Sequence, residues 1–519
     1  MGNKKGSLVM NIGVYALLVL TVVLAIYIMS SIHRKEENKY LKDSKIILYD
    51  GPKSLKDATT NDLEATSENL RDFSLMHCTD TKMKVNGNEL YVYDTNVNHT
   101  HQWVDSYLPP ISRTPITYFD FEGSALIEIQ VPSIDIDNVQ ISPVEYGIKP
   151  TIDKEKNTIS FKIANPDAYT VVFNQSVERA IHIFANPIEQ NPPKEGDEGV
   201  IYIGPGEWDI DTIPLKENTT LYIAGGAVVH GSIQANYANN ITVKGRGIID
   251  GSLYEGWQGK AAYVPLNLVG CNDITVQDII FLNSNAWVVS AYESKDAVMD
   301  GIKIISPRPN GDGITLQSCE NFIVQNSFVR SWDDSLVVKN YGVNTKNITF
   351  QNMQIWTDLA QSMEVGYETN KGDKKDSRIS QITFKDITVL YNFHKPVISI
   401  HNADNALVED VLFQNITVEH ALMGQGDAGE NNQLIDISIV NNSNWSTTKE
   451  RGQIRNVTID GVNVLDGTFP PSKIAGFDET HTTEQVSIKN LTILGNSITD
   501  FNEGQFEIEE TNTKNINIE

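Results

Sequence analysis

The segments FIVQNSFV (322–329) and ITFQNMQI (348–355) decide the fold, because they are two copies of a pattern that recurs along the second half of the chain. Each has the form apolar-x-apolar-x-[Asp/Asn/Gly]-x-x-apolar. Successive copies start 23, 25, 26, 34, 29, 46 and 29 residues apart. In chain order, the other six copies are ITVQDIIF (274–281), AVMDGIKI (297–304), ITFKDITV (382–389), VLFQNITV (411–418), VTIDGVNV (457–464) and VSIKNLTI (486–493).

Two short strands around a corner, repeated at a regular interval, are typical of a parallel β-helix in which each repeat forms one coil. Asn and Gly tolerate the left-handed conformation of a sharp corner, and stacked asparagines can hydrogen-bond from coil to coil. We therefore predict an all-β protein with a right-handed parallel β-helix over 196–519. The longest insertion lies between Val418 and Val457. The alternative is an array of sandwich strands with coincidental spacing.

Upstream of the repeats, short alternating apolar strands such as ITYFDF (116–121) and ALIEIQV (125–131) predict a small β-sandwich over 111–195. The proline-containing stretch IEQNPPKEGDEG (188–199) reads as the linker to the helix. The polar residues 36–110 are expected to form a stalk and an irregular lead-in.

The N-terminus carries an uncharged stretch from Gly6 to Ile32. A bilayer-spanning helix needs about 20 apolar residues, and no clear cleavage site follows this stretch. We expect residues 1–35 to be a transmembrane signal-anchor that places the body of the protein on the extracellular face of the membrane. A cleaved signal peptide and secretion are the alternative.

Composition excludes several classes of protein. The 67 acidic and 41 basic residues give a net charge of −26, which is unsuited to nucleic-acid binding and unfavourable for a polyanionic substrate. Three cysteines in 519 residues exclude a disulfide framework. Cys271 and Cys319 both lie three residues before a repeat and are separated by one intervening coil, so we expect buried thiols. We expect a monomer without metal or cofactor.

The densest group of chemically active residues is Asn310-Gly311-Asp312-Gly313 followed by Asp333-Asp334. The 21 residues from Asp312 to Asp333 are close to one coil, which places the carboxyl groups on neighbouring coils of one face. Crowded carboxyl groups raise one another's pKa. A protonated carboxylic acid beside an ionised one is what the hydrolysis of a glycosidic bond requires. The alternatives are a plain turn or a calcium site.

These motifs resemble the N-x-D-G and D-D motifs of the polygalacturonase family, glycoside hydrolase family 28, and equally those of the dextranase and isopullulanase family, glycoside hydrolase family 49. The stretch 201–233 resembles the entry into the helix of such enzymes. The resemblance implies an inverting glycosidase that acts on a polysaccharide. It also implies that Asp333 is the general acid and that Asp312 and Asp334 hold the attacking water.

The chain departs from the polygalacturonase pattern at two places. Gln361 stands where that family has the histidine of a G-H-G motif, and the stretch HKPVISIHNAD (394–404) lacks the R-I-K motif that grips a galacturonate carboxylate. We therefore expect a dextranase-like enzyme for a neutral α-glucan, with a polygalacturonase as the alternative. The predicted substrate-binding residues are Asn310, Trp332, Lys339, Gln361, Tyr367 and His401, and further aromatic candidates for sugar stacking are Trp287, Tyr341 and Trp356.

Two further functions stay open on the same fold. A polysaccharide lyase would use calcium on the aspartates and a basic residue, and few basic residues lie near the motifs. A non-catalytic glycan-binding β-helix would keep the aspartates for structure alone.

Overall fold

The structure is a computed structural model, and it describes residues 44–58, 74–98, 112–254, 263–424 and 431–519. The predicted signal-anchor over 1–35 lies outside these residues. Within the described ranges no helix has the length and apolar character needed to cross a membrane. Their one helical element is a 3-10 turn at Val144–Tyr146, and all other regular structure is β.

The N-terminal part is a β-sandwich whose two sheets enclose an apolar core that includes Phe119, Ile127 and Ile159. Strand β7 alternates buried and half-buried residues, as expected for a strand with one face toward a core. One sheet is built from β1 (Lys45–Leu48), β2 (Met76–His77), β5 (Tyr93–Val97), β6 (Ser112–Glu122), β12 (Ser176–Pro187), β11 (Asp167–Phe173) and β8 (Val139–Ser142). The other has the order β4 (Asn88–Glu89), β3 (Lys82–Val85), β7 (Ala125–Gln130), β10 (Thr158–Ile163) and β9 (Thr151–Asp153).

Strands β1 to β5 lie in the stretch for which the sequence predicted a stalk and lead-in. β1 pairs with β6, and β3 pairs with β7, so these residues are integral to the two sheets. These strands are only two to five residues long, too short for a periodic pattern to stand out in the sequence, which is why this contribution was missed.

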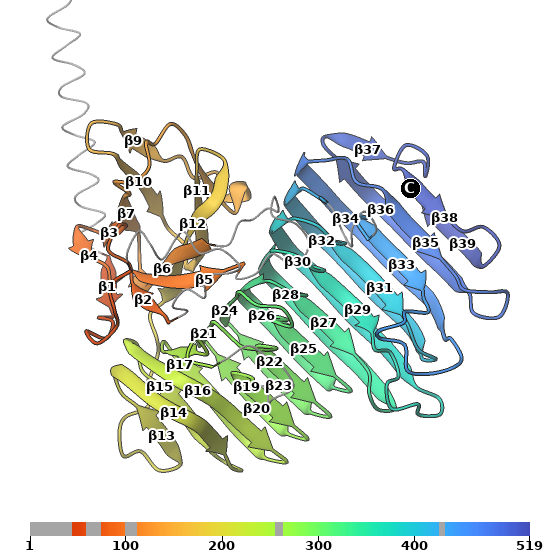
Figure 1. Cartoon of the computed structure of the whole chain (residues 1–519), viewed down its shortest axis with the longest axis horizontal. Helices are drawn as coiled ribbons and strands as arrows, with labels where there is room; N and C mark the ends of the chain where they lie inside the picture. Colours follow the sequence, from red (N-terminus) through yellow and green to blue (C-terminus); the bar gives the residue numbers. More distant parts are fainter. Residues whose placement is uncertain (1–43, 59–73, 99–111, 255–262, 425–430) are drawn as a thin grey trace, which may run out of the picture.

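The second part is a parallel β-helix, as predicted, and its described residues form one sheet of 27 strands (Figure 1). The starts of all eight predicted repeats stack as direct register partners, in the order Ile274, Ala297, Phe322, Ile348, Ile382, Val411, Val457 and Val486. The first coils hold β13 (Val200–Ile203), β14 (Gly206–Leu215), β15 (Thr220–Ile223), β16 (Ala227–Asn236) and β18 (Ile248–Asp250).

One long face of the helix carries the predicted repeats. Its strands are β17 (Asn239–Gly245), β20 (Asn272–Gln277), β23 (Lys295–Asp300), β26 (Glu320–Ser331), β28 (Asn344–Thr357), β30 (Arg378–Asn392), β32 (Leu407–Ala421), β34 (Gln453–Gly467), β36 (Thr483–Ile493) and β39 (Thr513–Ile518). Strands β21 (Ile280–Leu282) and β24 (Lys303–Ser306) continue round the corner, and β37 (Asn496–Ile498) folds back antiparallel on β36.

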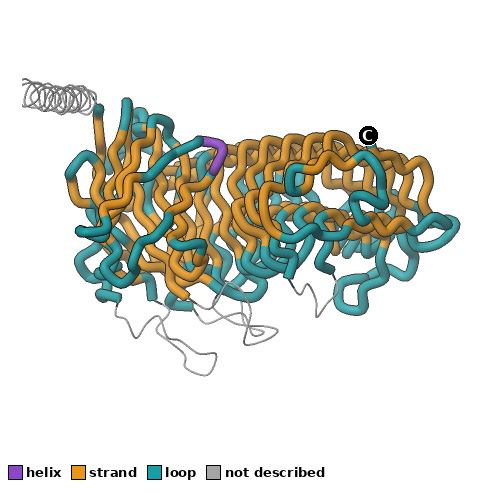
Figure 2. Tube along the Cα trace, turned by 90° about the horizontal axis from the view of Figure 1, so that it is seen from above, coloured by secondary structure: helices purple, strands orange, loops and turns teal. Residues whose placement is uncertain are grey.

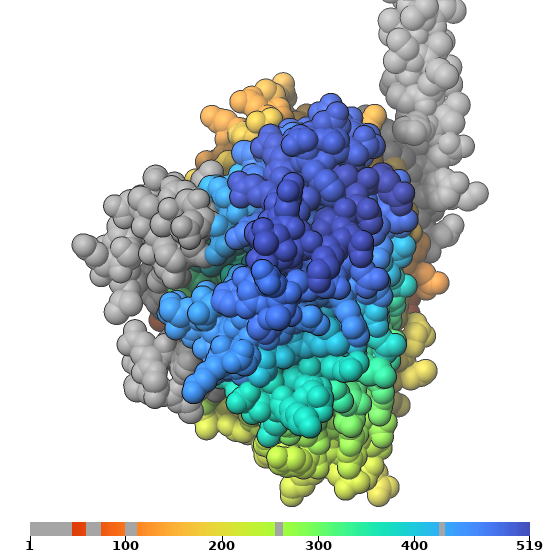
Figure 3. Space-filling view, turned by 90° about the vertical axis from the view of Figure 1, so that its right-hand side faces the viewer, coloured from red at the N-terminus to blue at the C-terminus, as the bar shows by residue number. Residues whose placement is uncertain are grey.

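A second long face holds the shorter strands that support the site. They are β19 (Leu266–Val269), β22 (Val289–Tyr292), β25 (Ile314–Gln317), β27 (Leu336–Lys339), β29 (Met363–Tyr367), β31 (Ile398–Asn402), β33 (Ile435–Ile439), β35 (Ser472–Ala475) and β38 (Phe506–Ile508). Figure 2 shows the coils as one long row, and Figure 3 shows the molecule from the side where the C-terminal coils face the viewer.

The corners confirm the predicted role of asparagine. Asn326 and Asn352 have φ of 53° and 52°, and the side-chain amide of Asn352 donates to Oδ1 of Asn326 at 2.7 Å. Such ladders bind successive coils at residues that already tolerate the left-handed conformation. The predicted buried thiols are also confirmed, because Cys271 and Cys319 are free and fully buried in the helix core.

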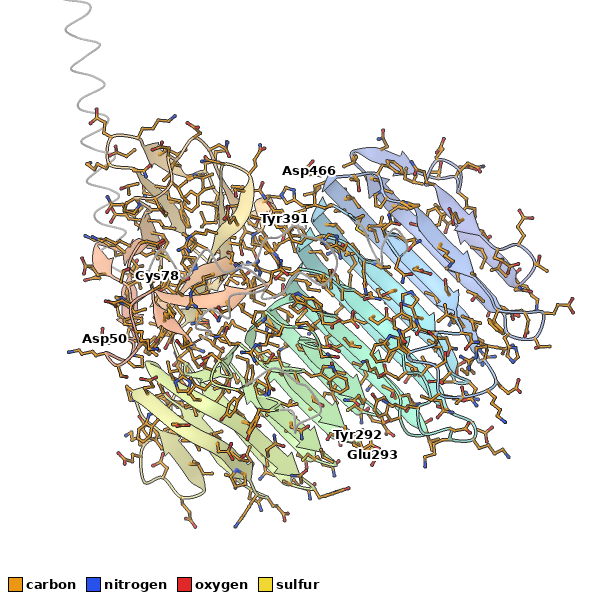
Figure 4. All side chains as sticks on the ribbon, viewed as in Figure 1. Asp50, Cys78, Tyr292, Glu293, Tyr391 and Asp466 are labelled. Carbon is orange, nitrogen blue, oxygen red and sulfur yellow. The ribbon has the colours of Figure 1, made fainter. Side chains whose placement is uncertain are left out.

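The sandwich packs against one side of the helix through a shared apolar cluster that includes Tyr118 and Phe184 from the sandwich and Phe328 and Trp356 from the helix. Arg246 adds a buried ion pair to Asp120, with Nε 2.8 Å from Oδ1. Tyr391 and Asp466 lie on the sandwich side of the helix, and Tyr292 and Glu293 lie at the opposite edge (Figure 4). The sandwich and the helix therefore share a continuous buried interface.

Candidate active site

A pocket of about 700 Å³ lies over the face formed by β25, β27, β29, β31 and β33. Side chains alternate along these strands, so every second residue faces away from the helix core. Thr315, Val337, Glu364, Ser399 and Asp436 are register partners in one such row. The loops that precede and follow these strands form the two rims of the pocket.

The structure brings the three predicted aspartates together at one rim. Asp312 precedes β25, and Asp333 and Asp334 precede β27. The backbone N–H of Gly313 donates to the carbonyl of Asp334 at 2.8 Å, and the N–H of Ile314 donates to that of Ser335 at 2.9 Å. These bonds stack the two loops on neighbouring coils, as the spacing in the sequence predicted.

Backbone donors fix two of the carboxylates. Oδ2 of Asp333 accepts a hydrogen bond from the N–H of Asn310 at 3.0 Å, and its Oδ1 accepts from the N–H of Asp334 at 3.1 Å. Oδ1 of Asp334 accepts from the N–H of Gln361 at 2.9 Å. Asn310 has a φ of 55°, so the N-G-D-G stretch uses asparagine at a left-handed position and the peptide N–H as the donor.

Burial governs the protonation of this cluster. Asp312 and Asp334 are 4% and 9% exposed. Burial, followed by the negative charge of Asp333, raises the pKa of Asp312 well above its usual range. The same two causes raise the pKa of Asp334 to about 8. The cluster therefore retains a proton near neutral pH, which is the condition for a carboxylic acid to act as a proton donor.

Lys339 provides a buried positive charge next to these acids. Its Nζ lies 3.1 Å from Oε2 of Glu368, 3.8 Å from Oδ2 of Asp312, and 4.8 Å from the ring centre of Trp287. Burial opposes the charge, but the carboxylates of Glu368 and Asp312 outweigh it and raise the pKa of Lys339. The ammonium in turn lowers the pKa of Asp312 and offsets part of the shift from burial.

The remaining predicted residues divide into two groups. Asn310, Trp332, Gln361 and Tyr367 line the pocket, as do the aromatic candidates Trp287 and Tyr341. Trp332 is 2% exposed and packs on Leu359, so its indole shapes the wall next to Asp333 and offers little free ring surface.

His401 and Trp356 require correction. The His401 ring is 1% exposed and lies under Tyr367, with the ring centres 4.4 Å apart and the planes 3° from parallel. Its Nδ1 is 2.9 Å from Oε2 of Glu364, and its Nε2 is 3.4 Å from Oδ2 of Asp436. Trp356 is fully buried at the sandwich interface. Strand alternation alone does not show which outward residues a neighbouring ring covers.

Several pocket residues had not been predicted. Among them, Glu368 and Lys371 follow β29, and Trp445 lies in the insertion after β33. Lys395, which precedes β31 and which the sequence offered as a partial substitute for the missing basic pair, also lines the pocket. Trp445 is 44% exposed. Its position in the longest insertion of the repeat series was the one available signal in the sequence.

The chain is similar to known plant and fungal proteins. It is 23% identical over 275 residues to a probable polygalacturonase of Vitis vinifera, a match that covers 44% of this chain and 55% of that protein. It is 22% identical over 196 residues to polygalacturonase QRT2 of Arabidopsis thaliana, covering 35% and 43% of the two chains. The matches thus span about half the length of these relatives.

Among solved structures, Dex49A from Penicillium minioluteum superposes with a TM-score of 0.61 at 14% identity, and the match covers 90% of this chain and 98% of that one. At this identity the likeness concerns the fold, and it extends over the sandwich as well as the helix. The model of the family described as glycosyl hydrolases family 28 matches residues 210–514, more than half of the chain. The protein therefore belongs to glycosyl hydrolases family 28.

Proposed function

We propose that this glycosidase hydrolyses O-glycosidic bonds of a neutral glycan with inversion at the anomeric carbon. The observation that carries the proposal is the cluster of Asp312, Asp333 and Asp334 in the pocket, in which burial and the charge of Asp333 raise the pKa of Asp312 and of Asp334. The resemblance to inverting enzymes supplies the stereochemical outcome.

In the proposed reaction, Asp333 donates a proton to the glycosidic oxygen as the bond from that oxygen to the anomeric carbon breaks. A water molecule held by Asp312 and Asp334 attacks the anomeric carbon from the opposite face and gives up a proton to this pair. One water is consumed, and the cluster as a whole gains and loses one proton per cycle. Because burial raises the pKa of Asp312 and Asp334, this pair must first lose a proton before it can accept one from the water, so the reaction requires a pH at which one of the two is ionised.

The residues of β31, two strands beyond the aspartates, favour a neutral substrate. In the stretch where the polygalacturonase resemblance leads one to expect a basic pair, Ser399 is fully buried and His401 is covered by Tyr367 and paired with Glu364. Neither side chain offers an exposed cation to the pocket. A galacturonate carboxylate at these two positions would lack a charge-assisted partner, and Lys395 is the residue of this stretch that brings a cation to the pocket lining.

A second candidate is hydrolysis of polygalacturonate. The curated relatives are named polygalacturonases, and two further lysines line the pocket. The Lys371 side chain is 46% exposed, with its Nζ 4.0 Å from Oε1 of Glu368, so it can still meet an anionic sugar. Lys395 stands on the other rim.

The test is to incubate the full chain with dextran, pullulan and polygalacturonate and to measure new reducing ends. Asp333→Asn should abolish release, whereas Asp209→Asn, an exposed aspartate on β14, should leave it unchanged. Release from a neutral glucan supports the first candidate, and release from polygalacturonate alone supports the second. Equal release by Asp333→Asn and the wild type would contradict the assigned acid.

The product's first-formed anomer, read by NMR, tests inversion separately. An unsaturated product that absorbs in the ultraviolet would instead identify a lyase. Binding without any release would identify a glycan-binding helix.

We also propose that the protein acts outside the cell as a monomer, attached to the membrane by residues 1–35. The support is the length of the uncharged N-terminal stretch. Fractionation of expressing cells tests it, because an anchored protein stays with the membranes after a salt wash and a secreted one appears in the medium.

A further inference from the structure

Trp445 is an exposed indole at the end of the pocket farthest along the coils from the catalytic aspartates. It lies between β33 and β34, lines the same pocket as Asp333, and is 44% exposed. Asp333 and Asp334 precede β27, and Trp445 follows β33. From β27 the pairings run to β29, then β31, then β33, so the two coils are three pairings apart. Three inter-strand spacings of about 4.8 Å place the two coils roughly 14 Å apart along the helix axis.

The loop that carries Trp445 is held by a dense set of hydrogen bonds. Oδ1 of Asp404 accepts from the backbone N–H groups of Thr447 and Thr448 at 2.7 and 2.8 Å, and from both hydroxyls at 3.1 and 3.0 Å. Arg451 donates to the carbonyls of Ala403, Val440 and Thr448 and to the Ser446 hydroxyl.

The turn immediately around Trp445 is closed as well. Oδ1 of Asn442 accepts from the N–H of Asn444 at 2.8 Å and of Trp445 at 3.2 Å, and the N–H of Ser446 donates to the carbonyl of Asn442 at 2.9 Å. The backbone is thus fixed on both sides of the tryptophan. A large apolar ring held out in solvent forgoes the stabilisation that burial would provide, which is the pattern of a binding surface.

The chemistry around the ring is that of a sugar site. An apolar ring face packs against the C–H face of a pyranose, and the neighbouring Asn442 and Asn444 are uncharged amides suited to hydroxyl groups. Lys395, in the loop before β31, lines the pocket on the opposite rim. The pocket therefore has a carboxylate cluster at one end and a rigid aromatic platform at the other.

We propose that Trp445 is the platform of a distal subsite that stacks on a pyranose unit of the glycan while the aspartates act on a bond about three coils away. The inference rests on the proposed function and deepens it, because it makes the enzyme selective for chains long enough to reach both ends of the pocket. A disaccharide would be bound by the acidic end alone.

The test separates binding from hydrolysis by using the full chain with Asp333→Asn. Isomaltose and isomaltoheptaose, and the corresponding di- and heptagalacturonate, are titrated by calorimetry. Asp333→Asn should bind a heptamer more tightly than the dimer, and the added Trp445→Ala should weaken heptamer binding about tenfold while leaving dimer binding unchanged. Trp445→Phe should recover part of the loss.

Trp208→Ala is the matched control, because Trp208 is 43% exposed on β14 outside the pocket. Equal heptamer binding with and without Trp445, or no preference for the heptamer in either series, would overturn the subsite. If heptamer binding depends on Trp445 but the wild type releases no reducing ends, the subsite stands and the proposed hydrolysis fails. If the wild type hydrolyses the chain and Trp445→Ala leaves its KM for the heptamer unchanged, the subsite alone fails.

Discussion

The guanidinium of Arg330 in the helix donates a hydrogen bond from Nη1 to Nε2 of His182 in the sandwich, at 3.2 Å. Arg330 also pairs with Asp358 at 3.2 Å and lies over the ring of Trp356. All four side chains are buried. Burial and the charge of Arg330 lower the pKa of His182 well below its usual range, so the imidazole is neutral and accepts the bond.

This contact adjoins the rim of the pocket that carries the aspartates. Arg330 is two residues before Trp332, and Asp358 is next to Leu359, whose N–H donates to the carbonyl of Trp332 at 3.0 Å. The loops that carry Asp333 and Gln361 therefore start from residues that the sandwich helps to hold. The sandwich positions the acids in addition to covering the side of the helix.

Replacement of Arg330 by Met should destabilise the protein and reduce turnover. It leaves Asp358 buried without its cation, a change that costs roughly 3–5 kcal/mol in comparable sites. We expect a lower melting temperature by calorimetry and a lower kcat with a smaller change in KM. Arg378→Met is the control, since Arg378 is 52% exposed in its pair with Glu409 and such pairs contribute at most about 1 kcal/mol. Equal losses in both variants would contradict the positioning role.

Replacement of Asp334 by Asn should stabilise the protein at alkaline pH. The pKa of Asp334 is raised to about 8 in the folded protein, whereas an unfolded aspartate titrates near ~3.9. The folded state then binds more protons than the unfolded state between these values, so the free energy of unfolding falls as the pH rises through this window. Asp334→Asn removes the contribution of Asp334 to this fall in the free energy of unfolding.

The melting temperature of Asp334→Asn should therefore exceed that of the wild type at pH 8, and the gap should shrink toward pH 4. Asp209→Asn should follow the wild-type curve throughout. A constant gap across the pH range would show that the gain comes from another source than the titration of Asp334.

Replacement of Lys339 by Met should shift the pH dependence of catalysis upward. The ammonium lowers the pKa of Asp312, so its loss leaves Asp312 protonated to a higher pH and delays the appearance of the ionised base. We expect kcat/KM at pH 5 to fall at least about tenfold and the ascending limb of the profile to move to higher pH. Lys371→Met, which removes a half-exposed lysine of the same pocket, should leave the limb in place.

Replacement of Gly313 by Ala should impair catalysis through backbone displacement. An added Cβ would lie 2.5 Å from the carbonyl oxygen of Ser335 and 2.5 Å from Cγ1 of Val329, closer than any real contact. The loop of Asp312 must then move away from the coil of Asp334, and overpacking of this kind costs about 1–3 kcal/mol. We expect a lower kcat. Gly204→Ala, whose Cβ would meet only Tyr202 at 3.5 Å, should retain full activity in the same assay.

Much of the fold follows from local sequence rules. The apolar positions of the repeats recur at one-coil intervals, and asparagines stand where the backbone must turn left-handed, so Phe322 and Ile348 stack as the pattern predicts. The same interval placed Asp312 and Asp334 on adjacent coils. These predictions succeeded because a β-helix makes neighbours in space from residues one period apart in the chain.

Contacts between residues that are not one repeat apart in the sequence could be found only from the tertiary structure. Sequence alone indicated the β-helix, the sandwich over 111–195 and the aspartate cluster. Only the packed structure covered His401 with Tyr367, buried Trp356 against the sandwich and brought Trp445 into the pocket. Each of these contacts involves a loop of irregular length or a strand of the other sheet. Burial raises the pKa of Asp312 and Asp334, and the burial of a side chain depends on the whole fold and not on one segment of the sequence.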